Sequence, residues 1–254
     1  MFAEVHGSGA KTIVAYHGWA GDHRDFTAVG RHLPEGWRLV AVDLPGYGRT
    51  PALGTLNAET LAEALAAHLD SLGAERVTLT GFCSGAILAL LAAQRRPDRA
   101  ERLVLIDAFA YLPWYFRVFV LGEFGRRAYQ STFASPLGRR ITDWAVRRRG
   151  GADAGFMESF REVDHATVHA YLRLLAGLGR LERFRDVRAP VALCWGEGSF
   201  GAVQRSVERF RSVWPDADLH PIRHAGHLLL VRGAPQIRQV LIQAEPARQE
   251  PSPR

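Results

Sequence analysis

The sequence is poor in cysteine and lysine and has no long apolar run. Its two cysteines cannot build the disulfide framework that staples small secreted domains. The longest near-continuous apolar run, Gly85 to Ala93, is too short to cross a bilayer. The first residues, MFAEVHG, lack a basic region followed by an apolar stretch, so we expect no signal peptide. These absences argue against a secreted scaffold or a membrane protein and favour a cytoplasmic one.

The composition is that of a globular protein with a sizeable core. The chain has 254 residues, of which 47% are hydrophobic and 23% are charged. A disordered chain would carry fewer apolar side chains. The length fits one large domain, or one domain that carries an insertion.

Positive charge is concentrated in one part of the chain. The net charge is +6, and residues 111–185 hold 13 arginines against 7 acidic residues, whereas the rest of the chain is balanced. Such a region is either a solvated basic face or a docking surface for an acidic partner. No nucleic-acid-binding module is visible, so we do not expect a nucleic-acid partner.

Short apolar runs alternate with helical patterns along most of the chain. The runs are rich in β-branched residues and suit strands that are buried on both faces. They lie at residues 12–16, 37–43, 76–80, 102–106, 190–195 and 219–222. Strands that alternate with helices predict an α/β fold with a parallel sheet covered by helices.

The alternation stops between residues 111 and 185, where the pattern is helical throughout. We therefore predict a core formed by residues 1–110 and 186–245, and an inserted helical cap at residues 111–185 over one end of the sheet. Residues 246–254 are polar and rich in proline, and we expect a disordered tail there.

The most informative motif is Gly81-Phe-Cys83-Ser-Gly85, which joins a predicted strand to a predicted helix. This Gly-x-Cys-x-Gly spacing is typical of a nucleophile elbow, a tight turn that exposes the central side chain. The Ser84 amide and the helix N-terminus would then face a developing oxyanion. The alternative is a buried, inert Cys83 at a strand end, which is how we interpret Cys194 in its own strand.

Four motifs in order make the sequence resemble the alpha/beta-hydrolase family over nearly the whole chain. They are His17-Gly18-Trp19 after the first strand, the segment at residues 43–49 (DLPGYGR), the elbow, and Ala225-Gly226-His227 near the end. The resemblance implies a mostly parallel central sheet of about eight strands flanked by helices, with the inserted cap above it.

The resemblance also assigns roles by position. Cys83 would be the nucleophile and His227 its general base and acid. The backbone N–H groups of Trp19 and Ser84 would form the oxyanion hole, and His17 would support that loop. No metal and no organic cofactor is implied; His165 and His169 lie one helical turn apart, but no third ligand accompanies them.

The sequence departs from the family at two positions. The nucleophile is cysteine instead of serine, as in dienelactone hydrolases, and Ser199 stands where the family keeps its acid. Asp107, which ends a predicted strand, is the best substitute, because some haloalkane dehalogenases keep their acid at that point. Asp107 could equally end the strand and cap a turn, and Glu197 is a weaker candidate.

The two departures fit together chemically. Serine needs a strong base that is oriented by an acid. A cysteine side chain ordinarily has a pKa of about 8.5, so a histidine and a helix N-terminus can suffice to form the thiolate. We therefore expect the loss of an orienting acid to cost a cysteine enzyme less than a serine enzyme.

Aromatic residues gather at the start of the predicted cap. Seven lie between residues 109 and 124, and of these Phe109, Tyr111 and Trp114 are our candidates for substrate binding. Such a cluster forms either an apolar acyl or aryl pocket or the core of the cap itself.

These features predict a hydrolase or acyl-transfer enzyme that acts on a small-molecule ester or thioester through an acyl-cysteine. The loops at residues 17–19 and 43–46 and the arginine-bearing cap are similar to those of pimeloyl-carrier-protein methyl ester esterases. An acidic acyl carrier protein is therefore a possible partner for the basic cap. The alternatives are a non-catalytic binder or scaffold on the same fold, and a lyase or carbon–carbon bond hydrolase.

Overall fold

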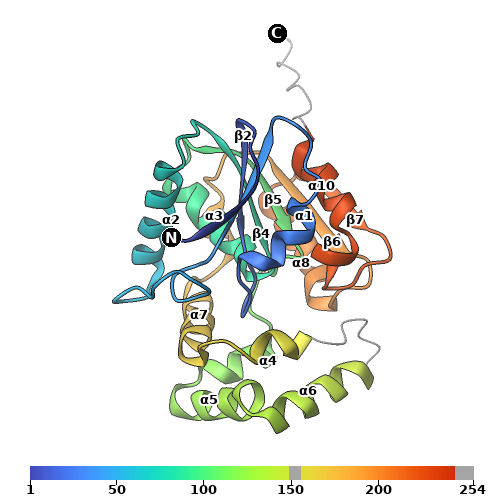
Figure 1. Cartoon of the computed structure of the whole chain (residues 1–254). Coiled ribbons are helices and arrows are strands. Elements are labelled where there is room, and N and C mark those ends of the chain that lie inside the picture. The colour runs from blue at the N-terminus through green and yellow to red at the C-terminus, as the bar shows by residue number, and fades with distance from the viewer. Residues whose placement is uncertain (149–155, 244–254) are drawn as a thin grey trace.

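A β-sheet runs through the middle of the molecule in the computed structural model of the chain (Figure 1). The structure describes residues 1–148 and 156–243. Within these residues the sheet has seven strands, which are β1 (Ala3–Gly7), β2 (Lys11–Tyr16), β3 (Trp37–Val42), β4 (Val77–Phe82), β5 (Ala100–Ile106), β6 (Val191–Gly196) and β7 (Asp218–Ile222).

The strands lie in the order β1-β3-β2-β4-β5-β6-β7, and only β1 runs antiparallel to its neighbour. All six strands predicted from apolar runs are present. The expected number of about eight was too high, because the chain supplies only one strand ahead of β2. That strand, β1, was missed because it lies at the sheet edge and none of its residues is fully buried, so its sequence carries little apolar signal.

Helices cover both faces of the sheet. Alternate side chains of each strand point to opposite faces, so Val14 and Tyr16 join one core cluster while Ile13 and Ala15 join the other. The first face packs against α2 (Ala58–Ser71), α3 (Ser84–Arg95) and α8 (Gly201–Val213). The second face packs against α1 (Thr27–Gly30), α9 (Leu229–Arg232) and α10 (Ala234–Ile242).

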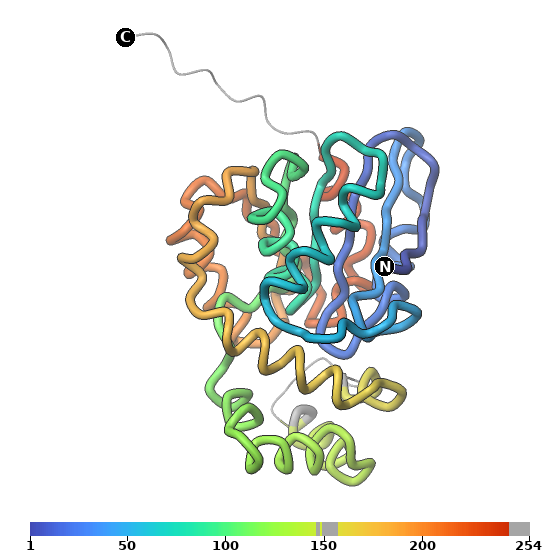
Figure 2. The backbone as a smooth tube through the Cα atoms, turned by 90° about the vertical axis from the view of Figure 1, so that its left-hand side faces the viewer, coloured from blue at the N-terminus to red at the C-terminus, as the bar shows by residue number. Residues whose placement is uncertain are grey.

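The chain between β5 and β6 forms only helices in its described part. We call residues 111–185 the helical segment, and it lies at one end of the sheet (Figures 1 and 2). Its elements are α4 (Trp114–Arg117), η2 (Val118–Val120), α5 (Gly122–Tyr129), η3 (Gln130–Ala134), α6 (Pro136–Arg148), η4 (Phe156–Phe160), α7 (His165–Gly177) and η5 (Leu181–Phe184).

The predicted tail at residues 246–254 and the last two residues of the predicted core lie outside the described residues. In the described part of the chain, no helix has both the length and the apolar character that crossing a membrane requires.

Candidate active site

Cys83 lies at the turn between β4 and α3, at the carboxyl edge of the sheet. Its backbone has φ 55° and ψ −116°, a left-handed conformation that a side-chain-bearing residue rarely adopts. A Cβ on Gly81 would overlap the Gly85 carbonyl, and a Cβ on Gly85 would overlap the Tyr16 carbonyl. The two glycines of the motif therefore allow the strained turn to pack tightly against β2.

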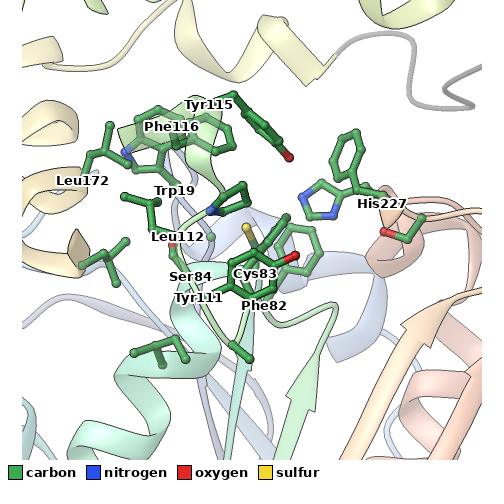
Figure 3. Close-up of a pocket in the computed structure, with 18 of the residues that line it drawn as sticks. Trp19, Phe82, Cys83, Ser84, Tyr111, Leu112, Tyr115, Phe116, Leu172 and His227 are labelled. Atoms are coloured by element: carbon green, nitrogen blue, oxygen red, sulfur yellow. The ribbon is translucent and has the colours of Figure 1, made fainter. Parts of the chain in front are cut away.

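His227 reaches Cys83 from the loop after β7 and forms a hydrogen bond with its side chain. Figure 3 shows both side chains at the same pocket. The imidazole is only 3% exposed and contacts the rings of Phe82 and Phe200, each 4.9 Å away between centroids. Burial lowers the pKa of His227, but hydrogen bonds to Asp107 and Cys83 and their negative charges outweigh it and raise the pKa to about 10. The site therefore favours an imidazolium at neutral pH.

Asp107 directly follows β5 and holds His227 from the side opposite Cys83. Its fully buried carboxylate accepts a hydrogen bond from His227 Nδ1, which leaves Nε2 for the thiol. The Ser199 hydroxyl donates to the same carboxylate oxygen, Oδ2, and the Gly196 amide donates to Oδ1 at 3.1 Å. Ser199, at the position of the missing acid, thus supports a carboxylate that comes from the neighbouring strand.

The Trp19 and Ser84 amides lie in the loop after β2 and at the start of α3. Among the described residues, neither amide has a hydrogen-bond partner. The loop before Trp19 is fixed by His17, whose Nδ1 donates to the Gly18 carbonyl at 2.8 Å and whose Nε2 accepts from the Leu44 amide at 3.1 Å. Burial lowers the pKa of His17 to about 4, so this ring is neutral and structural.

The Trp19 side chain joins the oxyanion loop to the helical segment. Its indole Nε1 donates to the Val168 carbonyl of α7 at 2.8 Å. Its ring also packs edge-on against Phe116, Phe133 and Phe160 of the helical segment, at 5.0–5.5 Å between centroids. The position of the Trp19 amide therefore depends on how the helical segment packs.

A cavity of about 800 Å³ opens above Cys83 and His227, between the sheet edge and the helical segment. Figure 3 shows Tyr115 and Phe116 on the side of the cavity opposite Cys83. Phe109 and Tyr111, two of the candidates for substrate binding, line it. Trp114 does not, because it is 77% exposed on α4, and its assignment to the pocket is corrected. Most other lining residues are apolar, including Ile87, Leu172, Leu175, Leu181 and Phe184.

Three residues that contact or line the site were not predicted from the sequence. Phe82 and Phe200 contact the His227 ring. Phe82 lies inside the elbow motif and Phe200 directly follows Ser199, so nearness to a predicted site residue was the available signal. Asp25 also lines the cavity, and nothing in the local pattern of residues 22–26 indicated it.

One group of residues in the described chain has the geometry to hold a metal ion. Ligand atoms of Asp22, His23 and Asp43 lie within 4.8 Å of one another. These side chains already have partners, since His23 Nδ1 bonds Asp43 at 2.8 Å and Asp22 pairs with Arg24. His165 and His169 of the helical segment instead bond Tyr129 and the Phe119 carbonyl.

Comparisons with known proteins agree with this fold. The sequence profile of a family described as alpha/beta hydrolase fold matches residues 11–234. A pimeloyl-[acyl-carrier protein] methyl ester esterase of Aromatoleum aromaticum is 29% identical over 232 residues, which cover 85% of this chain and 90% of that protein. The protein of the same name from Neisseria meningitidis serogroup C is 34% identical over 102 residues, and this match spans 40% of the chain and 38% of the relative.

Solved structures of low sequence identity share the fold. A thermophilic esterase from Thermogutta terrifontis superposes with a TM-score of 0.71 at 19% identity, covering 94% of this chain and 90% of that one. The enol-lactonase from Burkholderia xenovorans gives a TM-score of 0.73 at 17% identity, covering 95% and 94%.

Proposed function

The chain belongs to the alpha/beta hydrolase fold family, and from this premise we propose that it is an ester hydrolase that works through an acyl-cysteine. One observation carries the proposal. Asp107, His227 and Cys83 form a hydrogen-bonded line that ends at the floor of an apolar cavity. The Asp107 carboxylate supplies the acid that position 199 lacks, and this favours catalysis over a non-catalytic binder on the same fold.

The proposed reaction begins with attack of the Cys83 sulfur on the substrate carbonyl carbon. The carbonyl oxygen becomes an oxyanion, which the amides of Trp19 and Ser84 stabilise. As the tetrahedral intermediate collapses, the bond to the leaving oxygen or sulfur breaks and His227 gives that atom its proton. The products of this half-reaction are the acyl-Cys83 thioester and a free alcohol or thiol.

Hydrolysis of the acyl-enzyme uses the same groups in reverse roles. Neutral His227 takes a proton from water, and the resulting hydroxide attacks the thioester carbonyl. The carbon–sulfur bond breaks, the acid leaves, and Cys83 recovers its thiolate beside the imidazolium. Asp107 holds Nδ1–H throughout, so that Nε2 always faces the reacting atoms.

The lining of the cavity supports an apolar acyl or aryl group as the substrate portion next to the carbonyl. A carrier-linked ester is the more specific proposal. It rests on the named activity of the Aromatoleum and Neisseria relatives and on exposed arginines of the helical segment, Arg117, Arg126, Arg127, Arg140 and Arg148.

A substrate panel tests the proposed chemistry. Wild type, Cys83→Ala and Cys83→Ser are assayed on p-nitrophenyl esters and acyl thioesters of increasing acyl length. Cys194→Ala is the matched control, because the Cys194 thiol is buried in the core and the proposed reaction does not use it. We expect the wild type and Cys194→Ala to hydrolyse at least one substrate of the panel. Mass spectrometry of the intact protein after a rapid quench should show the acyl-enzyme in both. Full activity of Cys83→Ala would refute the mechanism.

Charge reversal tests the carrier. Arg140→Glu with Arg148→Glu should raise KM for a carrier-linked ester by about tenfold or more and leave kcat unchanged. The same variant should hydrolyse a small p-nitrophenyl ester as the wild type does. If KM rose equally for both substrates, or changed for neither, carrier docking at these residues would be contradicted.

A further inference from the structure

Asp25 is an acidic side chain of the catalytic cavity that the proposed reaction does not use. It lies in η1 (His23–Phe26), directly after the oxyanion loop, and lines the same cavity as Cys83 and His227. It is the only acidic residue that lines this cavity in the described chain.

Two contacts place the carboxyl group against the oxyanion loop. A Cβ on Gly21 would overlap Asp25 Oδ2, so the carboxyl packs directly on the Gly21 backbone. The backbone of Gly18, one residue before the oxyanion donor Trp19, is close enough to favour the charged form of Asp25. The carboxyl therefore lies beside the loop that would hold the substrate carbonyl.

The surroundings of Asp25 favour its neutral form. Burial and then the negative charge of Asp22 raise the pKa of Asp25 to about 7. The backbone of Gly18 and the positive charges of Arg24 and His227 lower the pKa of Asp25. Glu162 of the helical segment faces Arg24 and partly offsets that positive charge.

We propose that Asp25 selects the charge of the substrate group nearest the reacting carbonyl. Its neutral carboxyl donates a hydrogen bond to an uncharged oxygen or amide there, and its ionised form excludes a carboxylate. The site would thus accept esters, amides or hydroxyl-bearing acyl groups and reject free carboxylates at that place. The inference rests on the proposed function only in taking Cys83 as the reacting atom.

Two alkylating reagents test this selection without any turnover. The two reagents differ only in one group, which is a neutral amide in iodoacetamide and a carboxylate in iodoacetate. With either reagent the Cys83 sulfur bonds to the reagent carbon, the carbon–iodine bond breaks, and iodide leaves. Rate constants for Cys83 alone are measured by peptide mass spectrometry from pH 5.5 to 8.5.

The ratio of the two rate constants isolates Asp25. Both reagents react with the same thiolate, so the ionisation of Cys83 cancels in the ratio. Because the pKa of His227 is raised to about 10, its charge stays constant over this range. We expect the iodoacetamide-to-iodoacetate ratio of the wild type to rise by about tenfold or more, with a midpoint near pH 7.

Variants give the matched controls. Asp25→Asn is isosteric and should make the ratio independent of pH, and Asp25→Ser should do the same with a smaller side chain. Asp22→Asn should keep the rise but move its midpoint to lower pH, because the Asp22 charge helps to hold the proton on Asp25.

Three results would overturn the inference: a wild-type ratio that is flat with pH, a rise that survives in Asp25→Asn, or a Cys83 that neither reagent modifies. Failure of the proposed function would look different. In that case no ester would be hydrolysed, although the alkylation ratio could still follow Asp25.

Discussion

Exchanging the residues at positions 107 and 199 tests whether the acid of this site has moved to the neighbouring strand. Asp107→Asn removes a fully buried charge that accepts hydrogen bonds from His227, Ser199 and Gly196. A hydrogen bond to a charged group contributes about 1.5–3 kcal/mol. Since about 1.4 kcal/mol corresponds to a tenfold change in rate, kcat/KM should fall by about ten- to a hundredfold.

The pH profile should move as well. Asp107 is one of the groups that raise the pKa of His227 to about 10, against the lowering effect of burial. Without the carboxylate, burial prevails, the pKa of His227 falls, and the imidazolium that pairs with the thiolate is lost at lower pH. The basic limb of the kcat/KM profile should therefore shift to lower pH in Asp107→Asn.

The exchange itself is the decisive variant. The Ser199 hydroxyl already reaches the carboxylate oxygen that His227 contacts. A carboxylate at position 199 can then approach Nδ1 from the other side. We expect the double variant Asp107→Ser with Ser199→Asp to have a kcat/KM at least about tenfold higher than that of Asp107→Ser alone, measured on the best ester of the panel. An Asp107→Asn enzyme with wild-type kcat/KM, or an exchange that recovers nothing, would refute the reasoning.

Three further predictions concern stability, measured by urea unfolding. Gly81→Ala should lower the free energy of unfolding by about 2 kcal/mol or more, because the added Cβ would overlap the Gly85 carbonyl. Gly177→Ala is the control and should not destabilise the protein, because nothing lies within 4 Å of its Cβ. Folding raises the pKa of Asp25 to about 7, so between about pH 4 and 7 the folded state keeps a proton that the unfolded state releases. The free energy of unfolding should therefore fall as the pH rises through this range, by at most about 4 kcal/mol. Asp25→Asn should remove that fall. Trp19→Phe keeps an aromatic ring but loses the hydrogen bond to Val168, and should cost about 1 kcal/mol and lower kcat more than it raises KM.

Most of the sheet was predictable because its strands are buried on both faces. Such strands are short, apolar and β-branched, and this pattern is visible in the residues themselves. The edge strand β1 was not predictable in the same way, since solvent on one side relaxes the demand for apolar residues. The exposure of Trp114 also could not be read from its neighbours, because an aromatic residue in a helix serves a core, a pocket or a surface equally well.

The sequence alone predicted the elbow, because its Gly-x-Cys-x-Gly spacing is a local motif. The clash that keeps Gly81 small is also local, with the Gly85 carbonyl, whereas Gly85 must be small because it packs on the Tyr16 carbonyl of β2. The sequence also determined which residues end strands at the carboxyl edge, Asp107 among them. Only the tertiary structure decided which of these residues meet. Asp107, Ser199 and His227 come from three separate loops, and their hydrogen bonds depend on the lateral order of β5, β6 and β7, which no local pattern encodes. The place of Asp25 in the same cavity as Cys83 and His227 was decided in the same way, because these residues come from segments distant in sequence.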